Sequence, residues 1–253
     1  MKPLIPSRLR LSALLVALIC LIASVVLGIA VAGARRAGAI DATIIHAVHR
    51  IAGQHSTLAD VLITLSDTVV IFGGILALMI VGLVRRRWEV AVLAVAAPAI
   101  AIGLTELVGK PLTDRRIHGW LSYPSGHTVA AVSTLTVVLL LIVAGGSVLR
   151  AVLATLGWAA LSLVIMVGMV AKNDHYPSDT IGGFCLALAV VLPCVVLADR
   201  WRFRNQATIP QPRVGGVDPA MLAPMPEPVA ESALEPATDR FPAQPLPEVS
   251  DAG

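Results

Sequence analysis

The stretch LSALLVALICLIASVVLGIAVAG, residues 11–33, contains no charged side chain in 23 successive positions. About 20 apolar residues of α-helix cross the roughly 30 Å of hydrocarbon in a bilayer, where a chain must satisfy its own backbone hydrogen bonds. Lys2, Arg8 and Arg10 precede the stretch, as in a signal peptide, but the apolar core of a signal peptide has only roughly 7–15 residues. We therefore expect a retained signal anchor.

Five further apolar stretches of similar length follow along the chain. They are residues 68–84, 90–109, 128–146, 151–171 and 180–198. The composition agrees, because 57% of the 253 residues are hydrophobic and 14% are charged, whereas a soluble domain carries roughly 25% charged residues. The sequence predicts an all-α polytopic membrane protein, a bundle of six transmembrane helices in which 68–84 is the shortest span.

Residues 34–67, between the first two spans, are too many for a simple turn. Apolar residues recur there at helical spacing in two groups, Ile44, Val48 and Ile51, and then Leu58, Leu62 and Leu65. This spacing predicts short amphipathic helices on the outer membrane interface. We interpret the three histidines of the segment as part of a lid without a catalytic role: His46, His49 and His55.

The last 49 residues, 205–253, differ in composition from the rest of the chain. They hold ten prolines, no apolar periodicity, and seven acidic residues against two arginines, a net charge of −5. Such a segment cannot bury a core, so we predict a disordered cytoplasmic tail after a membrane domain of residues 1–204. Since the whole chain has a net charge of +3, that domain carries +8. We attribute this excess to lipid head groups and membrane orientation, with no nucleic acid as partner.

Three polar clusters interrupt the apolar background: Lys110–Arg116, Pro124–Thr128 and Asp174–Asp179. The first two share the loop between the third and fourth predicted spans, and two more crossings lead to the third cluster. An even number of crossings returns the chain to the same side, so all three clusters are expected on one membrane face. Ten lysines and arginines flank the spans on the N-terminal side against seven on the other. This bias predicts cytoplasmic termini and extracytoplasmic clusters.

The first two clusters contain residue types that suit an anionic group. Lys110, Arg115 and Arg116 supply positive charge, and arginine grips phosphate oxygens in a bidentate way. Ser125 and Gly126 open the fourth predicted span, where free backbone N–H groups and the helix dipole favour an anion. Ser125 also suits a helix cap, and both roles use the same geometry.

The third cluster contains a histidine and an aspartate four residues apart, His175 and Asp179. On a helix these side chains share one face, about 5–6 Å apart. The carboxylate would fix the imidazole tautomer and stabilise its positive form, which makes His175 a competent nucleophile. His127 is suited to protonate a leaving alkoxide. Glu106, four residues before Lys110, is expected to orient that lysine.

A metal site is the alternative interpretation of some of these residues. Asp114, His118 and Asp174 are potential ligands, but their spacing matches no recognised ligand pattern. The sequence therefore predicts neither a metal nor another cofactor.

Residues 59–198 resemble the type 2 phosphatidic acid phosphatases, also called lipid phosphate phosphatases, in a membrane-bound, bacterial-like form. Pro124-Ser125-Gly126-His127 looks like the second signature motif of that family. Lys110–Arg116 resembles the first motif, and His175–Asp179 with the following Gly182-Gly183 resembles the end of the third.

The resemblance implies a metal-independent mechanism through a phosphohistidine. His175 would attack phosphorus with the support of Asp179, while His127 would protonate the leaving group and later activate water. The phosphate oxygens would be held by Lys110, Arg115, Ser125 and Gly126.

Two positions depart from the pattern of the family. Ile117 stands where the first motif has an arginine. Arg115 fits a position that is often basic in the family, and we expect Arg116 to substitute for the missing arginine through a shift of the loop. Met169 stands where the third motif has an arginine, with Lys172 near the same helix end. Lysine is a point charge without the fork of arginine, so we expect a weaker phosphate grip or an unusual substrate.

The sequence thus predicts a cell-membrane enzyme that hydrolyses the phosphate or diphosphate ester of a lipid, such as a polyprenyl diphosphate or phosphatidate. Two alternatives stay open: a non-catalytic lipid-phosphate-binding or transport protein, and a lipid phosphotransferase that serves another acceptor. The chain length of the lipid and the oligomeric state do not follow from the sequence.

Removal of residues 205–253 is expected to leave the lipid phosphatase activity unchanged, because the tail contains no predicted span and no predicted site residue. The measurement is phosphate release per mole of purified full-length and truncated protein. A truncated protein that folds but releases no phosphate would contradict our interpretation of the tail.

Overall fold

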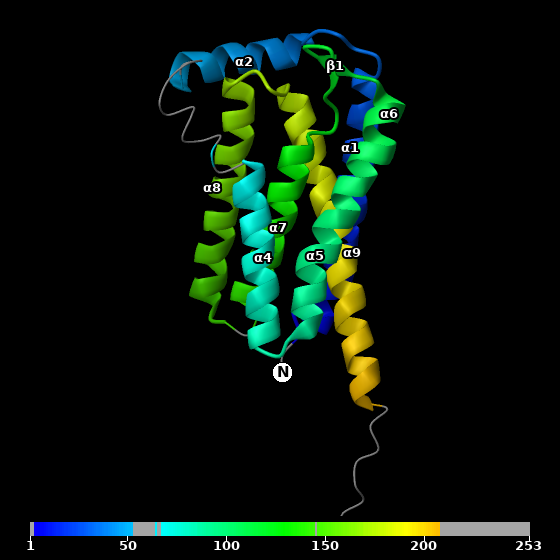
Figure 1. Cartoon of the computed structure of the whole chain (residues 1–253), viewed down its shortest axis with the longest axis vertical. Coiled ribbons are helices and arrows are strands. Elements are labelled where there is room, and N and C mark those ends of the chain that lie inside the picture. Colours follow the sequence, from blue (N-terminus) through cyan, green and yellow to red (C-terminus); the bar gives the residue numbers. More distant parts are fainter. Residues whose placement is uncertain (1–2, 53–63, 65–66, 145, 208–253) are drawn as a thin grey trace, which may run out of the picture. The chain divides into compact units, whose positions relative to one another are not determined.

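Figure 1 shows the computed structural model of the chain, which describes residues 3–52, 64, 67–144 and 146–207. The described residues are predominantly helical, as predicted. The predicted tail beyond residue 207 and the predicted amphipathic helix through Leu58, Leu62 and Leu65 lie outside the described residues.

The elements follow one another in a simple order. They are the 3-10 turn η1 (Ser7–Leu9), α1 (Arg10–Val31), α2 (Ala39–Ala52), α4 (Thr68–Val84), α5 (Trp88–Leu104), the π-helical turn η2 (Thr105–Gly109), α6 (Lys110–Thr113), β1 (Arg116–Ile117), β2 (Trp120–Leu121), α7 (Gly126–Val143), α8 (Val148–Ala171) and α9 (Pro177–Ala207).

Five helical segments of the described chain are long and apolar enough to cross a membrane, and each overlaps a predicted span. They are Ser7–Val31, Trp88–Thr113, Gly126–Val143, Val148–Ala171 and Pro177–Arg202. α4 has only 17 residues, so its length of about 26 Å falls short of the roughly 30 Å of hydrocarbon. The sixth predicted crossing therefore stays a prediction.

The outward helix faces carry large apolar side chains, such as the exposed Leu11 and Ile19 of α1 and the exposed Leu153 and Leu156 of α8. Soluble proteins rarely expose continuous apolar surface of this kind, whereas lipid solvates it. The surface of the helices thus fits a membrane protein.

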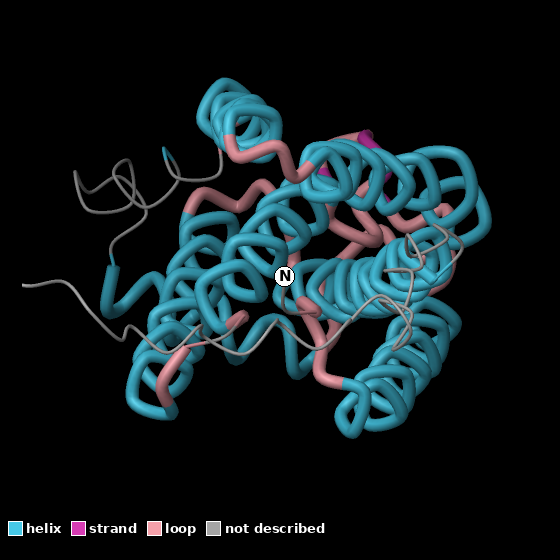
Figure 2. The backbone as a smooth tube through the Cα atoms, turned by 90° about the horizontal axis from the view of Figure 1, so that it is seen from below, coloured by secondary structure: helices cyan, strands magenta, loops and turns pink. Residues whose placement is uncertain are grey.

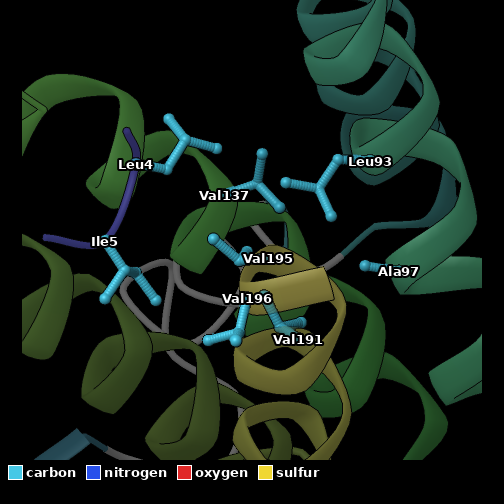
Figure 3. Packing of buried hydrophobic residues seen from close by; sticks show 8 residues of the cluster. All are labelled: Leu4, Ile5, Leu93, Ala97, Val137, Val191, Val195 and Val196. Carbon is cyan, nitrogen blue, oxygen red and sulfur yellow. The ribbon is translucent and has the colours of Figure 1, made fainter. Parts of the chain in front are cut away.

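α9 packs against α1, α5 and α7. Figure 2 shows the helices of the bundle from below. Their shared core contains Leu93 and Ala97 of α5, Val137 of α7, and Val191 and Val195 of α9 (Figure 3). Alanine and valine are small enough to let the helix backbones approach closely, as is usual between membrane helices. This packing fixes the start of α9 relative to the start of α7, where two of the predicted motifs lie.

The connection from α5 to α7 contains a small hairpin, although the sequence predicted only a loop there. β1 pairs antiparallel with β2, and the turn residues His118 and Gly119 have φ angles of 48° and 87°. Two successive residues with positive φ are typical of the tight turns that match the twist of a hairpin. Strands of two residues are too short to show a periodic pattern, so they could not be predicted.

α2 lies across one end of the bundle in Figure 1 and contacts α8 and α9. Its Val48 packs against the fully buried Ala171 of α8. A helix was predicted here from the spacing of Ile44, Val48 and Ile51. Its position at the membrane interface stays a prediction.

Candidate active site

The start of α9 positions the predicted His175–Asp179 pair. Pro177 is the first residue of the helix, where a missing N–H costs nothing. Asp179 accepts a hydrogen bond from the Tyr176 N–H at 3.1 Å, as the acidic residue of a capping box does. The same Oδ2 atom lies 3.8 Å from Nδ1 of His175. That Nδ1 atom is buried and has no hydrogen-bond partner among the described residues, so a small movement of the ring would bring it into contact with the carboxylate.

The start of α7 is joined directly to the start of α9. Ser125 caps α7, as predicted, because its Oγ accepts the Thr128 N–H at 3.3 Å. The Ser125 N–H donates to the Asp179 carbonyl at 3.0 Å. Gly183 permits this approach, since a Cβ at that position would lie 2.8 Å from the Ser125 carbonyl oxygen. The second and third sequence motifs are therefore parts of one local structure.

His127, the second residue of α7, and His175 face each other. Their ring centroids are 6.2 Å apart and the ring planes are inclined by 63°. His175 is only 9% exposed. Two imidazoles at this separation can both contact one phosphate-sized group placed between them.

Lys110 lines the same cavity as the two histidines. Its Nζ lies 2.6 Å from Glu106 Oε1, which is the ion pair predicted from their spacing. Glu106 belongs to η2, and π-helical turns are frequent at functional sites. Gly126 makes room for the pair, because a Cβ there would lie 2.8 Å from Glu106 Oε1.

These residues line a cavity of about 550 Å³. Its polar lining consists of Glu106, Lys110, His118, Gly126, His127, Asp174 and His175. Its apolar lining consists of Ile71, Phe72, Ile75, Ile102, Ile117, Trp120, Leu121 and Ala130. A cavity with both kinds of lining suits an amphiphile that has an anionic head group and an apolar chain.

A family model described as the PAP2 superfamily matches residues 13–203. The chain belongs to the PAP2 superfamily. PAP2 members are phosphatases, and membership indicates a phosphatase that acts on lipid phosphates. The match confirms the resemblance to this superfamily and extends it to α1 and α2. No curated protein and no solved structure matches the chain.

The structure places two arginines of the first motif outside the lining of the cavity, to which Lys110 and Gly126 belong. Arg115 is 1% exposed, and its guanidinium lies 2.6 Å from both Asp41 and Asp179. Arg116 is partly exposed and pairs with Asp114 at 2.9 Å. Neither arginine belongs to the lining of the cavity, so their contact with phosphate stays a prediction.

Asp114, a ligand in the alternative metal site, forms ion pairs with Arg35 and Arg116, both at 2.9 Å. The hydrogen bond from Arg116 is the main reason that the pKa of Asp114 lies below its ordinary value. The described residues contain no group of three histidine, cysteine or acidic side chains that could hold a metal ion.

The two departures from the PAP2 pattern have different surroundings. Ile117 lines the cavity, whereas Met169 is 2% exposed inside α8. Lys172 ends α8 and does not line the cavity. Of the lining residues that the structure describes, Lys110 alone carries a permanent positive charge.

Asp41 lies beside the candidate active site, and we did not predict it as a site residue from the sequence. It lies in the first turn of α2, where an acidic residue usually needs no explanation beyond the helix dipole. Its partner Arg115 is 74 positions away in the sequence. No local pattern relates residues so far apart, so only the structure brings them together.

Proposed function

We propose that the chain hydrolyses the phosphate or diphosphate ester of a membrane lipid through a phosphohistidine on His175. The observation that carries this proposal is the placement of His127 and His175 on one cavity, 6.2 Å apart, together with Lys110 and the first turn of α7. Phosphoryl transfer needs mainly positioning and charge stabilisation, and this arrangement offers both without a metal ion.

In the first step, Nε2 of His175 attacks the terminal phosphorus, and the bond from this phosphorus to the leaving oxygen breaks. That oxygen belongs to the lipid alcohol in a phosphate ester and to the lipid monophosphate in a diphosphate ester. Asp179 stands beside Nδ1 of the same ring and stabilises the positive charge that the ring gains. His127 gives its proton to the departing oxygen. In the second step, His127 takes a proton from water, which attacks phosphorus and breaks the bond to nitrogen.

The phosphate oxygens are held by Lys110 and by the start of α7. The first N–H groups of a helix have no partner within the helix, and Gly126 and His127 occupy these positions at the cavity. Ser125 orders this turn through its cap. Because Glu106 now pairs with Lys110, an arriving phosphate must share that lysine with the carboxylate.

The apolar lining offers a place for the lipid chain next to the phosphate. Ile71, Phe72 and Ile75 come from α4, Ile102 from α5 and Ala130 from α7. We propose a polyprenyl diphosphate or phosphatidate as substrate, with the site on the extracytoplasmic face of the cell membrane and both termini in the cytoplasm.

Purified protein is expected to release phosphate from a panel of lipid phosphates in detergent at an undiminished rate in the presence of EDTA. The reason is that the proposed nucleophile and acid are side chains, so no metal needs to be retained. Phosphate released per mole of protein is the measurement, with the His175→Ala variant as control.

Other outcomes of this experiment favour the alternatives. No release from any lipid in the panel would support a binding or transport protein. Transfer of labelled phosphate to an added alcohol, with none released as free phosphate, would support a phosphotransferase.

A further inference from the structure

Arg115 sits between two buried carboxylates from different helices. Its Nη1 donates to Asp179 Oδ1 and its Nη2 to Asp41 Oδ2, both at 2.6 Å. Asp41 is 5% exposed and Asp179 is 0% exposed. The guanidinium also lies 4.3 Å from the ring centroid of Tyr176, in cation–π geometry. Hence Arg115 is a buried bridge between α2 and the start of α9.

Asp41 has a second contact with the start of α9. Its Oδ1 accepts the Ser178 N–H at 2.9 Å, and its Oδ2 accepts the Ser178 hydroxyl at 2.7 Å. Burial by itself would raise the pKa of Asp41, but the hydrogen bonds from Arg115 and Ser178 outweigh it and hold the pKa below its ordinary value. Asp41 is therefore a charged partner that satisfies one of the free N–H groups in the first turn of α9.

The charges of this cluster do not cancel. Asp41 and Asp179 bring two negative charges against the single positive charge of Arg115, and all three are nearly excluded from water. An uncompensated charge in such a place is costly. The adjacent His175 ring, 3.8 Å from Asp179, provides the compensation when it becomes positive during phosphoryl transfer.

We infer that Asp41 is a positioning residue of the phosphatase. Through Arg115 and Ser178 it fixes Asp179, and Asp179 in turn orients His175 and stabilises its charged form. If Asp41 were neutral, the single charges of Arg115 and Asp179 would cancel each other. No net negative charge would then remain in the cluster to stabilise the positively charged ring of His175. α2 is therefore part of the catalytic unit and not only a cover over it. This inference rests on the proposed function.

The test compares Asp41→Asn with a matched control, Asp114→Asn, in the full-length protein. Asp114 also pairs with two arginines, but it lies outside this cluster. Asp41→Asn should lower kcat about 10- to 100-fold, a loss of the size seen when an outer partner that orients a metal-bound histidine is removed. KM should change little, because Asp41 does not line the cavity. Asp114→Asn should keep both constants.

A double-mutant cycle distinguishes two roles of Asp41: positioning Asp179, or only anchoring α2 to the rest of the protein. In an Asp179→Asn background, Asp41→Asn should have little further effect on kcat, since residues that act as one unit are non-additive. Independent, additive losses, or a kcat of Asp41→Asn equal to that of the wild type, would overturn the inference.

A second readout does not depend on turnover. Diethyl pyrocarbonate should modify His175 faster in Asp41→Asn than in the wild type, because the ring is less firmly held, and mass spectrometry measures the rate. An equal rate would also overturn the inference. An inactive wild-type protein would instead overturn the proposed function, which keeps the two failures apart.

Discussion

Replacing His175 with alanine is expected to lower phosphate release from a lipid phosphate by about four orders of magnitude or more, to the background rate. Alanine has no nitrogen to accept the phosphoryl group, and the cavity contains no second nucleophile supported by a buried carboxylate among its described residues. The measurement is phosphate release per mole of folded protein.

His46→Ala is the matched control for this change. His46 is an exposed histidine on α2, and it does not line the cavity. The control variant should keep the wild-type rate. A His175→Ala protein with more than about a hundredth of the wild-type rate would exclude His175 as nucleophile.

Replacing His127 with alanine is expected to abolish hydrolysis of lipid phosphates as well, but for a different reason. A lipid alkoxide is a strong base and leaves poorly without a proton, and loss of a general acid costs about 10²- to 10⁴-fold. An ester whose leaving group is already a weak base does not need this proton. With such an ester, His127→Ala should give a burst of leaving group followed by a stall, because the water step still lacks its base.

Rapid-mixing measurement of the leaving group tests this expectation. The amplitude of the burst should approach one equivalent per active site, and His175→Ala should show no burst. A His127→Ala protein that turns over the activated ester steadily would contradict the second role of His127. If His127→Ala lost the same share of activity with the lipid phosphate and with the activated ester, the role of His127 as proton donor to the leaving group would be contradicted.

Much of the fold could be predicted because membrane spans depend on a simple physical requirement. A long apolar run must be helical in lipid, so the segments 11–33 and 151–171 were recognisable from composition alone. α4 was less certain for the same reason, since its 17 residues are close to the limit. The hairpin between α6 and α7 was missed because its turn, at His118 and Gly119, carries no strand-length pattern.

The site was predictable where its geometry is local. Residues four apart on a helix share a face, and Glu106–Lys110 follows this rule, at 2.6 Å. His175 lies before the first residue of α9, so its 3.8 Å approach to Asp179 comes from the cap of that helix and not from a shared helix face. The common location of His127 and His175 followed from counting crossings between them.

The surroundings of Arg115 could not be predicted in this way. Its residue type suits phosphate, and the sequence assigned it that role. Whether a guanidinium faces a substrate or a buried carboxylate depends on a partner from another helix, Asp41, and on how α2 packs against α9. Such long-range pairings are properties of the tertiary structure.

A structure of the protein with orthovanadate would show whether His127 and His175 act on one phosphoryl group, because vanadate mimics phosphate and accepts a fifth ligand in the geometry of phosphoryl transfer. We expect vanadium bonded to Nε2 of His175, an oxygen on the opposite side within hydrogen-bond distance of His127, and Lys110 against the remaining oxygens. Vanadate that inhibits the enzyme but binds elsewhere, or that contacts neither imidazole, would contradict this expectation.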